Sequence, residues 1–156
     1  MSNGSDMWTP PGAKPMNLAT LNRLFAVLYR SLPMYLAGAT PWTREGNHRG
    51  QQAHATLERI VADQREMAGR VADLISRRRG RVDRREFPTD FAELNYLSLE
   101  FLLKELAESA RRDIASLEKC VVDVEDDPQA RALAEEALGA ERAHLEMLER
   151  ALPVSA

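Results

Sequence analysis

Residues 126–152, DDPQARALAEEALGAERAHLEMLERAL, carry the pattern that decides the fold. Asp127 followed by Pro128 is typical of a helix start, because an aspartate accepts the free N–H groups of the first turn and proline needs no donor there. Apolar residues then recur at spacings of three and four, namely Ala130, Ala134, Ala137, Leu138, Leu145, Leu148 and Leu152. This period predicts an amphipathic helix that reaches Leu152 and buries one face.

Glu141 is the charged residue on the apolar face of this helix. At about 100° per residue, it lies within about 20° of the direction shared by Ala134 and Leu148. A lone carboxylate is costly to bury in an apolar core, so Glu141 should be paired, protonated or bound to a cation. His144 lies about 60° to one side, at the edge of the stripe. The pair has the spacing for chelating one metal ion, but a histidine on a helix flank is more often a surface or hydrogen-bonded residue.

Three further stretches have the same helical period. Residues 17–38 form a first helix that ends near Gly38 and bends at Pro33, which lacks an N–H donor. A second, long helix follows the turn-rich residues 37–50, runs to about Arg79 and stops at Gly80. A third runs to about Glu125. We therefore predict an all-α four-helix bundle over residues 17–152, preceded by an extended arm at residues 1–16.

The connection between the second and third helices decides the topology. If Ser98 caps the third helix, the connection has about 18 residues and is long enough to cross a bundle about 40 Å tall. If Asp90 caps it instead, with Glu93 completing a capping box, only a short loop remains. Both alternatives fit the sequence.

Bulk composition favours a soluble helical protein of one domain. The chain has 156 residues, 44% of them hydrophobic and 29% charged, with eight glycines. A single cysteine, Cys120, excludes an internal disulfide framework and is expected to pack near the apolar face of the third helix. No signal sequence and no membrane span are recognised, so we expect a cytoplasmic protein.

Charge gives little support for a nucleic-acid partner. The formal net charge is −3, and the six arginines of RRRGRVDRR at residues 77–85 follow the end of a helix, where they favour the helix dipole and solubility. A protein partner is better supported. The first helix carries Phe25, Val27, Tyr29 and Met34 beyond its main stripe, which predicts a homodimer or a larger homo-oligomer that buries this helix.

Polar residues also fall on or beside the apolar stripes of the other helices. Gln64 lies near the middle of the second helix's stripe, and its amide needs partners that Glu141 is placed to supply. On the third helix, Asp113 is level with Glu141 if the two helices pair about the Asp-Asp-Pro turn, and Glu105 lies higher and farther round. Both acids have a second interpretation, as solvated ion pairs with neighbouring Arg or Lys side chains.

Two histidines near the start of the second helix, His48 and His54, offer a separate surface site together with Glu58. The histidines are six residues apart, which does not place them on one face of a helix. We therefore give this site little weight.

The four helices, the optional long connection and the segment ALGAERAHLEMLERAL resemble the ferritin-like superfamily, in particular bacterioferritin and rubrerythrin-type bundles. The resemblance implies a dimetal centre in which the fourth helix supplies Glu-x-x-His, here Glu141 and His144. It places the third-helix ligand at Glu105, with Asp113 as a substitute. The first-helix ligand position falls on Leu28, and the second-helix pair falls on Gln64 and Met67.

These departures leave at most half of a dimetal centre. Two ferrous ions bring four positive charges, which the remaining acids do not neutralise, so ferroxidase chemistry and an iron-dependent oxidoreductase activity are not expected. The sequence instead predicts a protein that binds or senses one divalent metal ion, iron or zinc. The alternative is a non-enzymatic bundle in which Gln64, Glu141 and His144 form a buried hydrogen-bond network.

Overall fold

The structure is a computed structural model and describes residues 17–38, 48–87 and 99–152. In these ranges it contains five α-helices and no strand, which confirms the predicted all-α class. The helices are α2 (Leu18–Tyr29), α3 (Leu32–Gly38), α4 (His48–Arg77), α5 (Leu99–Asp123) and α6 (Pro128–Ala151). The predicted arm at residues 1–16 lies outside the described residues.

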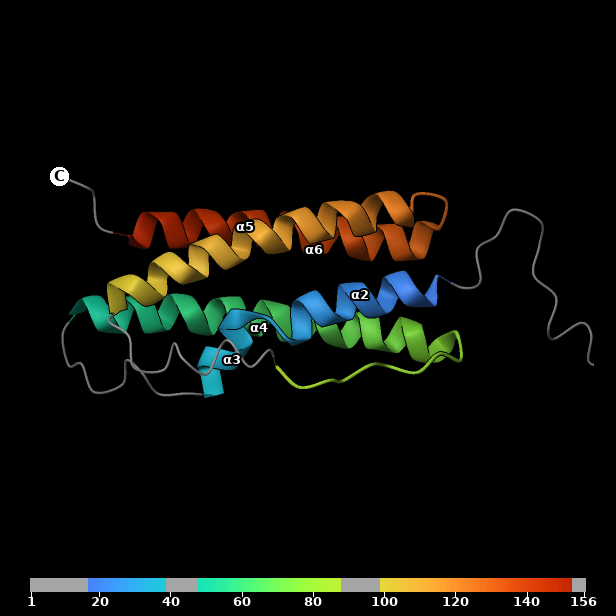
Figure 1. Cartoon of the computed structure of the whole chain (residues 1–156), viewed down its shortest axis with the longest axis horizontal. Helices are drawn as coiled ribbons and strands as arrows, with labels where there is room; N and C mark the ends of the chain where they lie inside the picture. The colour runs from blue at the N-terminus through green and yellow to red at the C-terminus, as the bar shows by residue number, and fades with distance from the viewer. Residues whose placement is uncertain (1–16, 39–47, 88–98, 153–156) are drawn as a thin grey trace, which may run out of the picture.

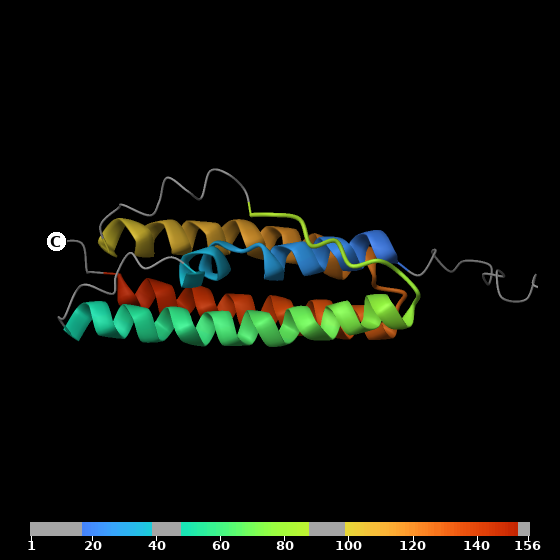
Figure 2. The same cartoon turned by 90° about the horizontal axis from the view of Figure 1, so that it is seen from below.

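The four longer helices lie side by side along one axis (Figures 1 and 2). Helix α2 packs against α4 and α5, and α6 packs against the same two helices, so the four close into a ring. Helices α4 and α5 run in one direction, and α2 and α6 run in the other (Figure 1). This arrangement buries the apolar stripe of each helix against two neighbours.

The parallel course of α4 and α5 requires a connection along the length of the bundle. Helix α4 ends at one end of the bundle and α5 begins at the other (Figure 1). Residues 80–87 are the described part of this connection and run back beside α2 (Figure 2). The course of residues 80–87 back along the bundle agrees with the long-connection alternative; the two predicted caps, Ser98 and Asp90, lie outside the described residues.

The predicted first helix is divided in two, whereas the sequence predicted one bent helix. Arg30 has non-helical φ and ψ of −108° and 27°, and α3 begins anew at Leu32. The hydroxyl of Ser31 accepts the N–H of Met34 at 3.2 Å and so caps α3. Pro33 is then in the first turn, where its missing donor costs nothing, and the helix breaks before it instead of bending at it.

The core consists of two apolar clusters stacked along the bundle. One includes Leu21, Leu24 and Phe25 of α2 with Met67 and Val71 of α4. The other includes Leu32 and Leu36 of α3 with Leu57 and Ile60 of α4 and Leu148 of α6. A buried polar residue lies between the two clusters on each of two helices. These residues are Gln64 on α4 and Glu141 on α6.

Asp127 ties together three segments at one end of the bundle. It caps α6, as predicted, by accepting the Ala130 N–H at 3.2 Å, with Pro128 as the first helical residue. Arg78, just after α4, donates to both of its carboxylate oxygens at 2.6 and 2.9 Å, and Asn17 donates at 2.8 Å. These charge-assisted bonds hold the pKa of Asp127 well below its usual range.

Helix α4 stops at the predicted place, through a left-handed residue. The N–H of Gly80 bonds to the Ile75 carbonyl at 2.8 Å and that of Arg79 bonds to the Ser76 carbonyl at 2.9 Å. These bonds form a Schellman turn in which Arg79 has φ of 62°. A Cβ on Gly80 would lie 2.5 Å from Leu18 Cδ2, so a larger residue here would require the Leu18 side chain of α2 to shift.

Residues 80–87 cover part of the apolar surface of α2 and α3. The Asn22 side chain donates to the Arg81 carbonyl at 3.0 Å and accepts the Asp83 N–H at 2.8 Å, which clamps the extended chain. Val82 packs against the core, and the Phe87 ring meets the Tyr35 ring edge-on at 5.5 Å. Some of the surface assigned to a subunit interface is therefore covered within the chain, and the interface itself stays a prediction.

Within the described part of the chain, no helix is long and apolar enough to cross a membrane.

Candidate functional site

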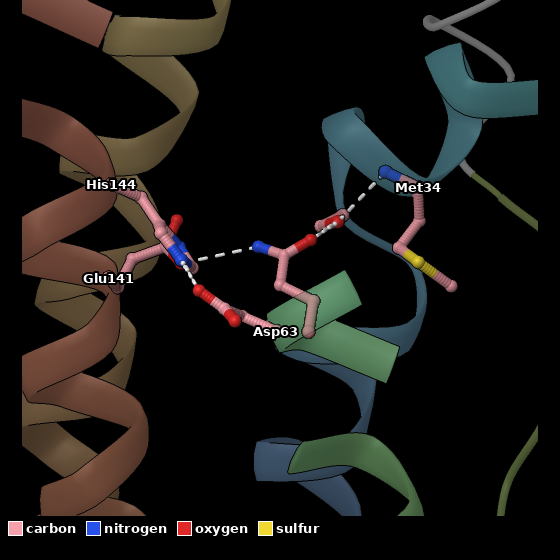
Figure 3. Close-up of polar contacts among 6 residues, drawn as sticks. Met34, Asp63, Glu141 and His144 are labelled. Carbon is pink, nitrogen blue, oxygen red and sulfur yellow. Dashed lines mark hydrogen bonds and ion pairs between the residues drawn. The ribbon is translucent and has the colours of Figure 1, made fainter. Parts of the chain in front are cut away.

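The polar cluster at the middle of the bundle gathers residues from α4, α6 and the α2–α3 junction (Figure 3). Glu141 and His144 are each 2% exposed, and so is Gln64. The predicted inward orientation of Glu141 and the burial of Gln64 are confirmed. His144 turns inward from the edge of its stripe and is buried with them.

His144 lies between two carboxylates. Its Nδ1 atom is 3.2 Å from Glu141 Oε1, and its Nε2 atom is 2.8 Å from Asp63 Oδ2 (Figure 3). Burial alone would lower the pKa of His144, but the hydrogen bonds and charges of Glu141 and Asp63 outweigh it and raise this pKa above its ordinary value. With a proton on each nitrogen, the imidazolium donates to both acids.

Gln64 extends the cluster to the α2–α3 junction. Its Nε2 donates to Glu141 Oε1 at 3.2 Å, as predicted, and its Oε1 accepts the Ser31 hydroxyl at 2.6 Å. Ser31 in turn accepts the Met34 N–H, so one chain of hydrogen bonds leads from α6 through α4 to the cap of α3 (Figure 3). Because the hydroxyl proton points to Oε1, the amide is held with its N–H toward Glu141.

Asp113 of α5 places a third acid near this cluster. Its Oδ2 atom is buried and has no hydrogen-bond partner among the residues that the structure describes. Burial and the nearby charge of Glu141 raise the pKa of Asp113 to about 8, against a smaller opposing effect of Arg112. At neutral pH the folded chain therefore keeps a proton on Asp113.

Glu105 is not part of this cluster. It is partly buried on α5 but makes no hydrogen bond or ion pair with Glu141 or His144 among the described residues. The α5 acid that lies near Glu141 is Asp113, as expected from pairing the two helices about their turn. Leu28 and Met67, where the resemblance puts metal ligands, fill the core at 2% and 4% exposure.

Glu141, His144 and Asp113 could bind a cation only after His144 and Asp113 have lost protons. Within residues 17–38, 48–87 and 99–152, no group of three or more His, Cys, Asp or Glu side chains is gathered to hold a metal as they stand. Glu141 and Asp63 contact different nitrogens of the His144 ring, so these two carboxylates do not converge on one nitrogen. The 3.2 Å between His144 Nδ1 and Glu141 Oε1 is nevertheless close to the roughly 3.0–3.4 Å that separates two ligands bound about 2.1 Å from one ion.

The position of Asp63 also suits metal binding through Nδ1 of His144. A histidine that binds a metal through one nitrogen usually donates its other N–H to a carboxylate, which fixes the ring. Asp63 does this at Nε2 and leaves Nδ1 directed at Glu141. Glu141 and His144, with the buried oxygen of Asp113 nearby, are therefore the residues that could hold a divalent cation in place of their protons.

Two other candidate residues, His54 and Cys120, lie outside the buried cluster. His54 pairs with Glu58 at 3.2 Å on the surface of α4, and the His48 side chain lies outside the described residues. Burial raises the pKa of the Cys120 thiol, which disfavours a reactive thiolate.

Several arginines of residues 77–85 have partners within the chain. Arg78 binds Asp127, Arg85 pairs with Asp83 at 2.9 Å, and the Arg84 guanidinium lies 5.6 Å from the centre of the Phe25 ring. These contacts account for three of the six without a nucleic-acid partner.

Ser31 and Asp63 belong to the cluster but were not predicted from the sequence. Ser31 has a usable signal, because serine is a preferred helix cap and Pro33 is tolerated in the first turn that follows. Asp63 has none: it precedes Gln64 at the edge of the apolar stripe, and its side chain is 47% exposed. Only the packing of α4 against α6 brings it to His144.

Comparison with protein-family models, with curated proteins and with solved structures finds no match to this chain.

Proposed function

We propose that this chain is a ferritin-like four-helix bundle protein that binds or senses one divalent metal ion, iron or zinc, through Glu141, His144 and Asp113. The observation that carries the proposal is the His144 ring, which Asp63 holds at Nε2 so that Nδ1 faces the buried Glu141 carboxylate. Asp63 is then a positioning residue and does not touch the ion. The parallel α4 and α5 with their long connection support the ferritin-like part of the proposal.

The charge balance of the cluster favours a cation. Asp63, Asp113 and Glu141 are three acids, and His144 is the base that bonds to two of them. Without a metal, the cluster compensates for the excess acid by protonating Asp113 and His144. A divalent ion supplies the same two charges and partners the Asp113 oxygen that has none.

The same residues limit the site to one ion. Gln64 directs an N–H donor at Glu141, and the buried side chains of Met67 and Leu28 offer no charged ligand. A second divalent ion would bring two more charges with no further acid to neutralise them. The proposed activity is therefore binding or sensing, not two-metal oxidation of iron.

Metal analysis of protein purified without a histidine tag tests this proposal. After incubation with ferrous or zinc ions and gel filtration, mass spectrometry should find about one ion per chain, and Glu141→Ala should lose it. Glu146→Ala is the matched control, because Glu146 is an exposed glutamate of the same helix. A folded wild-type chain that retains no ion under both conditions would contradict the proposal.

A second candidate function rests on the Ser31–Gln64–Glu141 chain of hydrogen bonds. These bonds satisfy buried polar groups without a metal, so the bundle would be a non-enzymatic structural or interaction protein. This alternative predicts that Glu141→Gln keeps the stability of the wild type, and that chelators leave the melting temperature unchanged. A large fall in melting temperature on adding chelator would exclude it.

A further inference from the structure

A cavity of about 470 Å³ opens on the outer face shared by α2, α3, α4 and residues 80–87. It is separate from the buried cluster: none of Glu141, His144 and Asp113 lines it. Its volume is in the range of sites that bind small organic molecules.

The cavity exists because α4 presents very small side chains where α2 and residues 80–87 leave a gap. Ala68, Gly69 and Ala72 form this wall, and a Cβ on Gly69 would meet no atom within 4 Å. The facing wall is aromatic. The rings of Phe25 and Tyr29 stack with centroids 4.8 Å apart; Phe25 is buried, and the partly exposed rings of Tyr29 and Phe87 are the aromatic surface that a bound molecule can contact.

Two arginines give the cavity its charge. Arg65 of α4 and Arg84 of the covering segment both line it. In the part of the chain that the structure describes, neither forms an ion pair with a carboxylate, whereas Arg70, five residues farther along α4, pairs with Glu136 at 2.7 Å. Both arginine side chains are exposed and border a mainly apolar hollow, which complements a molecule with an apolar body and an anionic group.

We propose that this cavity binds one amphipathic organic anion, with an aromatic or aliphatic body against Tyr29 and Phe87 and a carboxylate or sulfonate group at Arg65 and Arg84. The proposal does not depend on metal binding in the bundle interior, since the two sites share no charged residue.

Two fluorescent probes that differ only in charge test the proposal on the full chain. 8-Anilino-1-naphthalenesulfonate carries the anion, and N-phenyl-1-naphthylamine has the same body without it. The sulfonate should bind saturably, one molecule per chain, and at least about tenfold more tightly than the amine. The double substitution R65Q/R84Q should remove this preference, whereas Arg77→Gln, on an exposed arginine of the same helix, should keep it.

Two glycines provide a matched pair for blocking the cavity. Gly69 lines it and Gly139 of α6 does not, yet both are exposed helix positions where an added Cβ meets nothing. Both Gly→Leu changes should stabilise their helix by a similar amount, about 0.5–1 kcal/mol. Only Gly69→Leu should weaken sulfonate binding, by about tenfold or more.

Three outcomes overturn the proposal. The first is equal sulfonate binding by Gly69→Leu and Gly139→Leu. The second is equal affinity for the charged and neutral probes. The third is a wild-type dimer in sedimentation velocity that Gly69→Leu dissociates, because the occupant of this face is then a second copy of the chain. If Gly69→Leu does not fold, the R65Q/R84Q comparison decides, because it leaves the cavity wall intact.

Discussion

The Nε2 atom of His144 lies 2.8 Å from Asp63 Oδ2, a contact that joins α6 to α4 across the bundle. It fixes the imidazole so that its other nitrogen meets the buried Glu141 carboxylate. The His144 ring thus links Asp63, whose side chain is half exposed, to Glu141, whose side chain is buried. The raised pKa of His144 depends in part on this contact, and so does the proposed binding of a cation.

Asp63→Asn should lower the pKa of His144, because the amide removes a negative charge and a charge-assisted acceptor from Nε2. NMR titration of the imidazole resonances measures this pKa. The control is Asp73→Asn, an exposed aspartate of the same helix, which should leave it unchanged. An unaltered His144 pKa in Asp63→Asn would show that the contact does not hold the proton. If the metal proposal is right, Asp63→Asn also weakens binding about 10–100-fold.

Ser31→Ala should destabilise the fold by about 1–3 kcal/mol. It removes the cap of α3 and leaves the buried Gln64 carbonyl without its donor. Urea denaturation measures the loss. Ser116→Ala, an exposed mid-helix position on α5, should be neutral or slightly stabilising. Equal midpoints for the two variants would argue against a structural role for the Ser31 hydroxyl.

Asp113→Asn should stabilise the metal-free chain increasingly as pH rises. The folded pKa of about 8 lies above the unfolded value, so the wild type loses stability across the interval from about pH 4 to pH 8. The loss approaches about 1.4 kcal/mol per pH unit as an upper limit. Denaturation in the presence of chelator at pH 4.5, 6.5 and 8.5 should show the gain from Asn growing and then levelling above pH 8. A gain that does not change with pH would contradict the burial of a protonated Asp113.

Asp127→Ala should cost about 2–3 kcal/mol at pH 7, since it removes the α6 cap and the partner of the half-buried Arg78. The pKa of Asp127 is depressed, so its contribution is present above pH 4 and disappears as pH falls through the lower folded value. The neighbouring exposed Asp126 is the control, and Asp126→Ala should be nearly neutral. A variant difference that persists unchanged at pH 2 would contradict this account.

Much of the fold follows from local rules that the sequence states directly. The cap at Asp127, the stop before Gly80 and the inward direction of Glu141 depend on residue type and helical period, and all three are seen. The break at Ser31 was missed because Pro33 was interpreted as an interruption within one helix. A serine two residues earlier turns the same proline into the first turn of a new helix.

Other parts depend on packing that no local rule contains. The sequence allowed a short or a long connection after α4, and the clamp of Asn22 on residues 81 and 83 shows how the long one is held against α2. In the candidate site, helical spacing identified Glu141, His144 and Gln64, but it left both Glu105 and Asp113 as candidates on the third helix. The pairing of α5 and α6 about their turn separates these two acids, whereas only the register of α4 brings Asp63 to His144.

Calorimetric titration of zinc ions into the wild type and Glu141→Gln near pH 7.5, in two buffers of different ionisation enthalpy, tests the central claim most directly. The account predicts one ion per wild-type chain with release of protons, because His144 and Asp113 must give up theirs to become ligands. Glu141→Gln should stay folded and lose most of the affinity. No binding by a folded wild type, or equal binding by both proteins, would contradict the account and leave the cluster as a hydrogen-bond network.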